Sequence, residues 1–306
     1  MGILNKCTLI IVSAGLMLSS CITNTKSIKR NIDDNLVISN INGLAKRILK
    51  TKADNFVFEL IKEKTPEDVF ELSARNGKIL IKGNNGVSMA SGLNWYLKKY
   101  CNAQFTIIDE QLSLPDKLPL PKTAEQIKTE YKFRYFFNVC TFSYTMAWWN
   151  WDQWERQIDW MAMNGINLPL AITGQEAVWY EVYKELGLTD KQIDKFLVGP
   201  AYLPWSWMGN IDSLGGPLPK SWIQSHKLLQ QRILERERAF GMTPVLQGFS
   251  GHVPESISKI YPKETIIIRP IALMKLIPTQ MIRFSLPIWA KQYTIQLLRQ
   301  THRLYG

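Results

Sequence analysis

The sequence predicts an α/β protein made of two successive regions. Between residues 130 and 262, near-continuous apolar strands alternate with amphipathic helices, a pattern typical of a parallel sheet covered on both faces. Before them, residues 36–122 combine helices with a strand–turn–strand unit. Three prolines (Pro115, Pro119 and Pro121) mark a linker at the end of this first region. We therefore expect a small α/β domain over residues 36–122 and a second domain over residues 130–262.

The elements of the small domain can be assigned in order. Residues 40–50 fit a helix, and Phe56–Leu60 has the composition of a strand. Two further strands between residues 70 and 83 meet at Asn76-Gly77, a pair that favours the tight turn of a hairpin. Residues 88–100 then predict a helix. Its buried face is expected to carry Leu93, Tyr96, Leu97 and Tyr100.

The second region repeats a strand–helix unit. The expected strands are 135–140, 166–172 and 243–249, and the expected helices include 151–163 and 222–240. Asn164-Gly165 follows the first of these helices, and Gly241 follows the second. Glycine tolerates the left-handed conformation in which many helices end, so these residues support the predicted helix ends. Three such units are the beginning of a (β/α)8 barrel. A complete barrel takes about 250 residues, so we expect an incomplete TIM-type barrel.

The N-terminus predicts an export signal rather than part of the fold. Lys6 precedes the apolar run 9–18, which is too short to span a bilayer as a helix. Leu18-Ser19-Ser20-Cys21 looks like a bacterial lipobox, so residues 1–21 are interpreted as a lipoprotein signal peptide with Cys21 lipidated. Polar residues 22–35 would be a tether. A membrane-anchored lipoprotein, periplasmic or on the cell surface, is expected; the alternative is a plain secretory signal with an incidental cysteine.

The charge distribution argues against nucleic acid as a partner. The net charge is +11, but residues 265–306 contain six basic side chains and no acidic one. The rest of the chain is therefore only slightly basic, and it has no basic cluster with interleaved aromatic residues. The change in composition sets residues 263–306 apart as a divergent tail. A frameshifted reading frame or a divergent basic helix would each explain it.

Two pairs of polar residues follow the predicted barrel strands. Asn138 and Cys140 alternate along the expected first strand, so their side chains would share a face and could contact ligand hydroxyls, or be satisfied interior groups. Gln175 and Glu176 follow the second strand, where barrel enzymes keep functional groups. Glu176 is an acid/base or substrate-contact candidate, or simply a cap for the following helix.

A long excursion over residues 199–221 adds Trp205 and Met208. An exposed tryptophan on a loop is typical of a sugar-stacking platform, and loop packing is the alternative. None of the three histidines (His226, His252 and His302) has metal-ligand spacing, so no metal or other cofactor is expected. We expect free thiols at Cys101 and Cys140, because two cysteines do not make a disulfide framework.

Several long strings resemble one family. WERQIDWMAMNGINLPLA, GQEAVW, GPAYLPW and GMTPVLQGFSGHVPE are similar to the alpha-N-acetylglucosaminidases of glycoside hydrolase family 89. The resemblance covers about residues 36–262 and fades at Tyr261-Pro262. It implies a small α/β domain, a (β/α) barrel and removal of terminal alpha-linked N-acetylglucosamine with retention of configuration. It places Asn138, Cys140, Trp205 and Met208 in the pocket for that sugar.

The family's two catalytic glutamates lie further along than the matching residues here, so no catalytic residue is assigned. The leading hypothesis is an N-terminal fragment of an exo-glycosidase, inactive alone, whose partner would be a glycan with terminal N-acetylglucosamine. Two alternatives stay open: a non-catalytic surface glycan-binding lipoprotein, and an enzyme split across two chains. The sequence does not indicate an oligomeric state.

Overall fold

The computed structural model describes residues 33–63, 65–108, 110–248, 251–262, 266–270, 280–284, 299–300 and 302–304. The predicted signal peptide, Cys21 and most of the predicted tether lie outside these residues. No helix among the described residues is long and apolar enough to cross a membrane.

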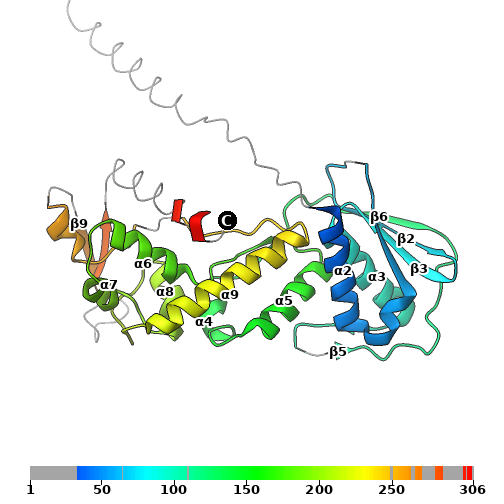
Figure 1. Ribbon diagram of the computed structural model, residues 1–306, viewed down its shortest axis with the longest axis horizontal. Coiled ribbons are helices and arrows are strands. Elements are labelled where there is room, and N and C mark those ends of the chain that lie inside the picture. Colours follow the sequence, from blue (N-terminus) through cyan, green and yellow to red (C-terminus); the bar gives the residue numbers. More distant parts are fainter. Residues whose placement is uncertain are drawn as a thin grey trace, which may run out of the picture. The chain divides into compact units, whose positions relative to one another are not determined.

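The first region is built on a four-stranded sheet in the order β1-β3-β2-β6 (Figure 1). The strands are β1 (Phe56–Leu60), β2 (Val69–Arg75), β3 (Lys78–Gly83) and β6 (Glu125–Lys128). β1 pairs parallel with β3, and β2 pairs antiparallel with β3 and β6. Asn76 and Gly77 have φ of 52° and 74°, the positive values that the predicted two-residue turn requires. β6 lies beyond residue 122, so the sheet of the small domain extends past the predicted boundary.

Helices α2 (Asp34–Leu49) and α3 (Gly86–Cys101) pack with this sheet, and the short helix η1 (Lys50–Asn55) links α2 to β1. α2 begins inside the predicted tether, where the Asp33 side chain caps it by accepting from the backbone N–H of Asn35. On α3, Leu93, Tyr96 and Leu97 are fully buried, as their helical spacing predicts. Two further short strands, β4 (Gln104–Phe105) and β5 (Glu110–Gln111), pair with each other.

The second region contains three neighbouring parallel segments. β7 (Tyr135–Phe136) pairs with β8 (Leu168–Pro169), and Leu170 forms a parallel bridge with Val245. The crossovers carry helices α5 (Trp151–Met163) and α9 (Lys220–Ala239), so the order is that of consecutive βα units. All three segments are shorter than the predicted strands. At β7 the reason is local, because Phe137 has a φ of 137° and turns the chain away from the sheet.

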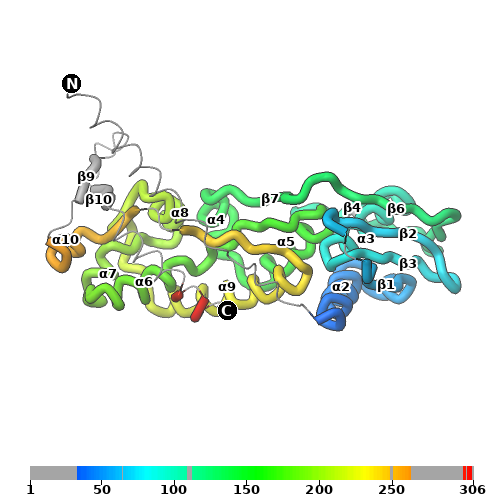
Figure 2. The backbone as a smooth tube through the Cα atoms, turned by 90° about the horizontal axis from the view of Figure 1, so that it is seen from above, coloured from blue at the N-terminus to red at the C-terminus, as the bar shows by residue number. Residues whose placement is uncertain are grey.

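The remaining helices of this region are α4 (Thr141–Tyr144), α6 (Gln175–Glu185), α7 (Asp190–Phe196), η2 (Pro200–Tyr202), α8 (Leu203–Trp207) and α10 (Ile257–Ile260). α9 contacts both α5 and α6, and α4 contacts α8, as the trace in Figure 2 lets the reader follow. In the predicted tail, β9 (Ile266–Pro270) pairs antiparallel with β10 (Gln280–Phe284). That hairpin differs from the helix that one interpretation of the tail expects.

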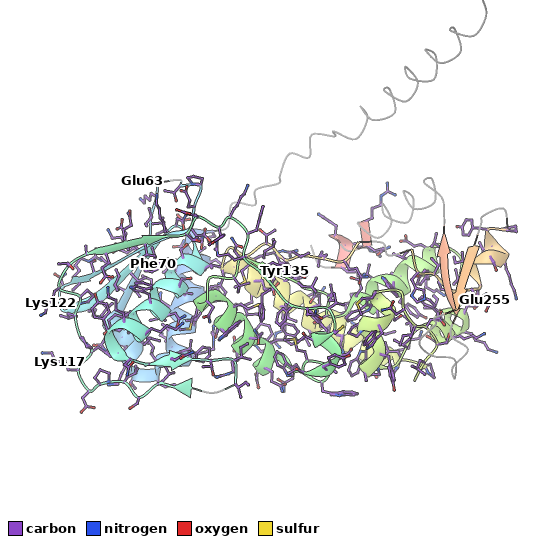
Figure 3. All side chains as sticks on the ribbon, turned by 180° about the vertical axis from the view of Figure 1, so that it is seen from behind. Glu63, Phe70, Lys117, Lys122, Tyr135 and Glu255 are labelled. Carbon is purple, nitrogen blue, oxygen red and sulfur yellow. The ribbon has the colours of Figure 1, made fainter. Side chains whose placement is uncertain are left out.

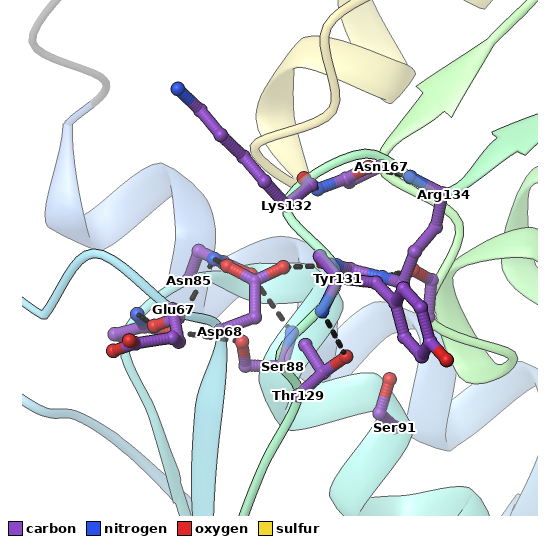
Figure 4. Close-up of polar contacts among 12 residues, drawn as sticks. Glu67, Asp68, Asn85, Ser88, Ser91, Thr129, Tyr131, Lys132, Arg134 and Asn167 are labelled. Atoms are coloured by element: carbon purple, nitrogen blue, oxygen red, sulfur yellow. Dashed lines mark hydrogen bonds and ion pairs between the residues drawn. The ribbon is translucent and has the colours of Figure 1, made fainter.

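Two basic residues tie the small domain to the barrel region. The Arg134 guanidinium pairs with Asp68, whose other oxygen accepts from Asn85 at 2.7 Å (Figure 4). The Arg134 backbone N–H donates to the side chain of Asn167 at 2.9 Å. Arg47 on α2 donates twice to Asp159 on α5, at 2.6 and 2.7 Å. These bidentate and networked contacts fix where the first βα unit begins.

Candidate functional site

Asn138 and Cys140 lie just beyond β7 rather than on it. The Asn138 side chain accepts a hydrogen bond from the backbone N–H of Cys140 at 2.8 Å, which folds these residues into a turn before α4. Asn138 is exposed, and Cys140 is a half-buried free thiol. The expectation that the two residues alternate along a strand is therefore wrong, because the turn at Phe137 ends the strand first.

Trp205 and Met208 lie on α8 and at its C-terminal end, beside α4. The Ser143 hydroxyl on α4 donates to the Pro200 carbonyl at 2.9 Å, and the Phe142 and Trp207 rings meet edge to face with centroids 6.3 Å apart. Trp205 is 36% exposed and Met208 is half-buried. The structure thus brings the segment of Asn138 and Cys140 next to the segment of Trp205 and Met208, with all four side chains at least partly open to solvent.

Gln175 and Glu176 occupy the first turn of α6, behind Gly174, whose φ of 71° turns the chain from the sheet into the helix. Both side chains are buried, and Glu176 is 0% exposed. One Glu176 oxygen accepts from the Trp222 indole N–H at 3.2 Å, and the other has no hydrogen-bond partner. Burial therefore raises the pKa of Glu176 to about 7, although the Trp222 hydrogen bond favours the charged form. A sugar has no open path to this carboxyl.

A small aromatic pocket adjoins Glu176. Its lining comes from α4, the α4–α5 loop, α5, the start of α6, η2, α8 and α9. It has room for about one or two water molecules. The residues that line it are Phe142, Met146, Ala147, Trp149, Trp154, Thr173, Gly174, Glu176, Pro200, Leu203, Trp207, Trp222, His226 and Leu229. Of the six residues predicted to bind substrate, only Glu176 is among them.

Sequence reasoning did not assign Trp222 and His226 to the site. The two rings stack with centroids 3.8 Å apart and an interplanar angle of 15°. Burial lowers the pKa of His226, so the imidazole stays neutral to a lower pH than that of an exposed histidine. Their spacing of four residues on one helix was the available signal, since such side chains face the same way. No group of three or more potential metal ligands occurs in the described part of the chain.

Comparisons with known proteins cover both regions. Residues 134–305 match the family model "Alpha-N-acetylglucosaminidase (NAGLU) tim-barrel domain", and residues 39–120 match the corresponding N-terminal domain. The first match runs past Pro262, where the resemblance was expected to fade. The chain is 47% identical to human alpha-N-acetylglucosaminidase over 189 residues, which are 62% of this chain and 25% of the human protein.

Solved structures give the same assignment. A family 89 glycoside hydrolase from Clostridium perfringens, in complex with 2-acetamido-1,2-dideoxynojirmycin, superposes with a TM-score of 0.83 at 36% identity, covering 89% of this chain and 32% of that one. The complex of the C. perfringens enzyme with its substrate GlcNAc-alpha-1,4-galactose gives the same score and covers 31% of that chain. This chain thus spans about a quarter to a third of the length of these relatives.

These matches confirm the predicted fold class, a small N-terminal α/β domain followed by part of a (β/α) barrel. The barrel-domain match alone spans more than half of the sequence. The chain belongs to the alpha-N-acetylglucosaminidase family, glycoside hydrolase family 89.

Proposed function

We propose that this chain provides the glycan-binding part of an alpha-N-acetylglucosaminidase, with terminal alpha-linked N-acetylglucosamine as the bound sugar. The observation that carries the proposal is the juxtaposition of the α4 and α8 segments. The α4 segment (residues 138–144) and the α8 segment (residues 200–208) are joined by the hydrogen bond from Ser143 of α4 to Pro200 of η2, and each presents its candidate sugar contacts to solvent. The C. perfringens relative, at 36% identity, was solved with GlcNAc-alpha-1,4-galactose as its substrate.

The four side chains fit the chemistry of an acetamido sugar. Trp205 offers an exposed indole on which an apolar ring face can stack. The Asn138 amide can donate to a sugar hydroxyl, since its oxygen is already used by the Cys140 backbone N–H. Cys140 and Met208 offer soft sulfur surface suited to the acetamido methyl group. This division assigns polar recognition to the α4 side and stacking to the α8 side.

We further propose that these residues bind without cleaving. Retaining hydrolysis needs two carboxyl groups about 5 Å apart, one as acid/base and one as nucleophile. Among the six candidate sugar-contact residues, Glu176 is the only carboxyl, and it is closed to solvent. The chain would then be the N-terminal fragment of a hydrolase, inactive alone. The same observation fits the alternative of a non-catalytic glycan-binding protein, whose export and attachment to the membrane through Cys21 would rest on the sequence of residues 1–21.

Equilibrium binding tests the proposal. Methyl alpha-N-acetylglucosaminide, titrated into the purified chain by calorimetry, should bind. Trp205→Ala should weaken binding about 5- to 150-fold, taking for the sugar face the about 1–3 kcal/mol that a base stacked on an aromatic side chain contributes. Trp95→Ala is the matched control, because Trp95 is 40% exposed on α3 of the small domain and should leave binding unchanged. Equal affinity in the wild type and Trp205→Ala would rule out the assigned platform.

A further inference from the structure

The aromatic pocket has a position that the proposed sugar contacts do not explain. Phe142 of α4 and Leu203 and Trp207 of α8 line it, while Asn138, Cys140, Trp205 and Met208 of the same segments do not. The pocket therefore lies behind the two segments, on the side away from the candidate sugar contacts that they carry. The contacts among the side chains that line the pocket therefore also fix the distance between those two segments.

Glu176 and Trp222 form one wall of this pocket. Trp222 belongs to α9 and Glu176 to α6, and the indole N–H donates to the carboxyl at 3.2 Å. Two other rings contact Trp222: His226 stacks on it, and Trp148, from the loop after α4, meets it edge to face with centroids 5.1 Å apart. A movement of the Trp222 ring would thus displace Trp148 and, through it, the α4 segment.

The Glu176 carboxyl is poorly suited to carry a charge here. One of its oxygens has no hydrogen-bond partner, and the side chain is shielded from water. A buried carboxylate left in this state is costly, so the proton stays on the group until about pH 7. Above that pH the ionised carboxyl favours any state in which more water reaches this oxygen than the one or two molecules for which the closed pocket has room.

No cation among the pocket-lining residues offsets this charge. His226 on α9 is the only other titratable group in the lining, and burial lowers its pKa. The residues that α4, α5, η2 and α8 contribute are all uncharged. Lys220, two residues before Trp222, is paired with Asp194 at 2.6 Å. His252, which contacts the Ser206 carbonyl of α8, faces Asp212.

We propose that Glu176 is a positioning residue: its neutral carboxyl and the Trp222 indole lock the wall behind the α4 and α8 segments, and its ionisation loosens that wall. The inference rests on the proposed function only in assigning sugar contact to these segments. The lock itself is a property of the described side chains. It predicts that the site around Cys140 is more open at alkaline pH than at acidic pH.

Cys140 is a built-in reporter of this opening. Its rate of alkylation by iodoacetamide, followed by mass spectrometry of its peptide in the full chain, should be compared between the wild type and Glu176→Gln from pH 6 to pH 8. The thiolate fraction changes equally in both proteins and cancels in the ratio of rates. In the closed state the pKa of Glu176 is about 7, and in an open, hydrated state it would return to the ordinary value of 4.5. The equilibrium constant for opening is then about tenfold larger at pH 8 than at pH 6.

The ratio of the wild-type to the Glu176→Gln rate should therefore rise over this range, by about tenfold at most, because Cys140 is only half-buried in the closed state and also reacts there. Glu255→Gln is the matched control, because Glu255 is an exposed carboxyl of the same region and should follow the wild type (Figure 3). Trp222→Phe keeps an aromatic ring but removes the hydrogen bond that favours the ionised form, so its midpoint should move to higher pH. A ratio that stays constant from pH 6 to pH 8 would overturn the proposal.

The two proposals can fail separately. If methyl alpha-N-acetylglucosaminide does not slow alkylation of Cys140 while the pH-dependent ratio is present, the sugar assignment is wrong and the positioning role stands. If the sugar protects Cys140 and the ratio is flat, the binding site stands and Glu176 is not its lock.

Discussion

Replacing Glu176 by glutamine should change how the stability of the chain depends on pH. The folded state holds the carboxyl with a pKa of about 7, against an ordinary value of 4.5. Below pH 4.5 both the folded and unfolded states are protonated at this position, so its contribution is fully present. As the pH rises toward 7, the unfolded state releases the proton and the folded state keeps it, so the free energy of unfolding falls.

The magnitude follows from the shift of the pKa. Each unit is worth about 1.4 kcal/mol, so the whole effect amounts to about 3 kcal/mol, of which roughly 2.5 kcal/mol falls between pH 5 and pH 8. Glutamine is nearly isosteric, its oxygen can still accept from the Trp222 indole, and it does not titrate. The difference in unfolding free energy between Glu176→Gln and the wild type should therefore shift by that amount in favour of the variant as the pH rises.

Urea unfolding followed by tryptophan fluorescence, at several pH values from 5 to 8, measures this difference. Other buried carboxyls, such as Glu237, contribute equally to both proteins and cancel. Glu255→Gln should follow the wild type throughout. Parallel stability curves for the wild type and Glu176→Gln would refute the assignment of a neutral, buried carboxyl to this position.

Three other outcomes are expected. Metabolic labelling with palmitate should label the wild type in its host and not Cys21→Ala; equal labelling of both would end the lipoprotein interpretation. Trp154→Ala should lower the free energy of unfolding by about 3–5 kcal/mol, because Trp154 is 2% exposed and packs against Phe137, Phe142 and Trp149. A loss below about 1 kcal/mol would show that this aromatic cluster is not a packed core. The purified chain should not hydrolyse aryl alpha-N-acetylglucosaminides, and turnover that vanished in Glu176→Gln would instead make Glu176 catalytic.

Elements with local signals could be predicted closely. β1 and α5 have the predicted bounds, since α5 starts at a capping box formed by Asn150 and Gln153 and carries a regular apolar spacing. The Asn76-Gly77 turn and the left-handed Gly165 and Gly241 likewise follow from the conformational preferences of these residues. In each case neighbours in sequence determine the structure.

The strand ends and the pocket depend on contacts that no local pattern encodes. The ring of Phe137 contacts those of Phe142 and Trp154, which lie beyond the predicted strand 135–140, and its positive φ places Asn138 and Cys140 in a turn rather than a strand. The burial of Glu176 depends on Trp222, which lies 46 residues later in the sequence. Sequence spacing therefore does not predict that Asn138 and Cys140 lie in a turn or that Glu176 is buried.

Saturation-transfer NMR with GlcNAc-alpha-1,4-galactose tests the central claim most directly, because it shows which ring of a bound disaccharide touches the protein. The wild-type chain should transfer saturation mainly to the N-acetylglucosamine ring and its acetamido methyl group. Trp205→Ala should lose that transfer, and Trp95→Ala should retain it. Transfer to the galactose ring alone, or equal transfer from the wild type and Trp205→Ala, would contradict a site for terminal N-acetylglucosamine between α4 and α8.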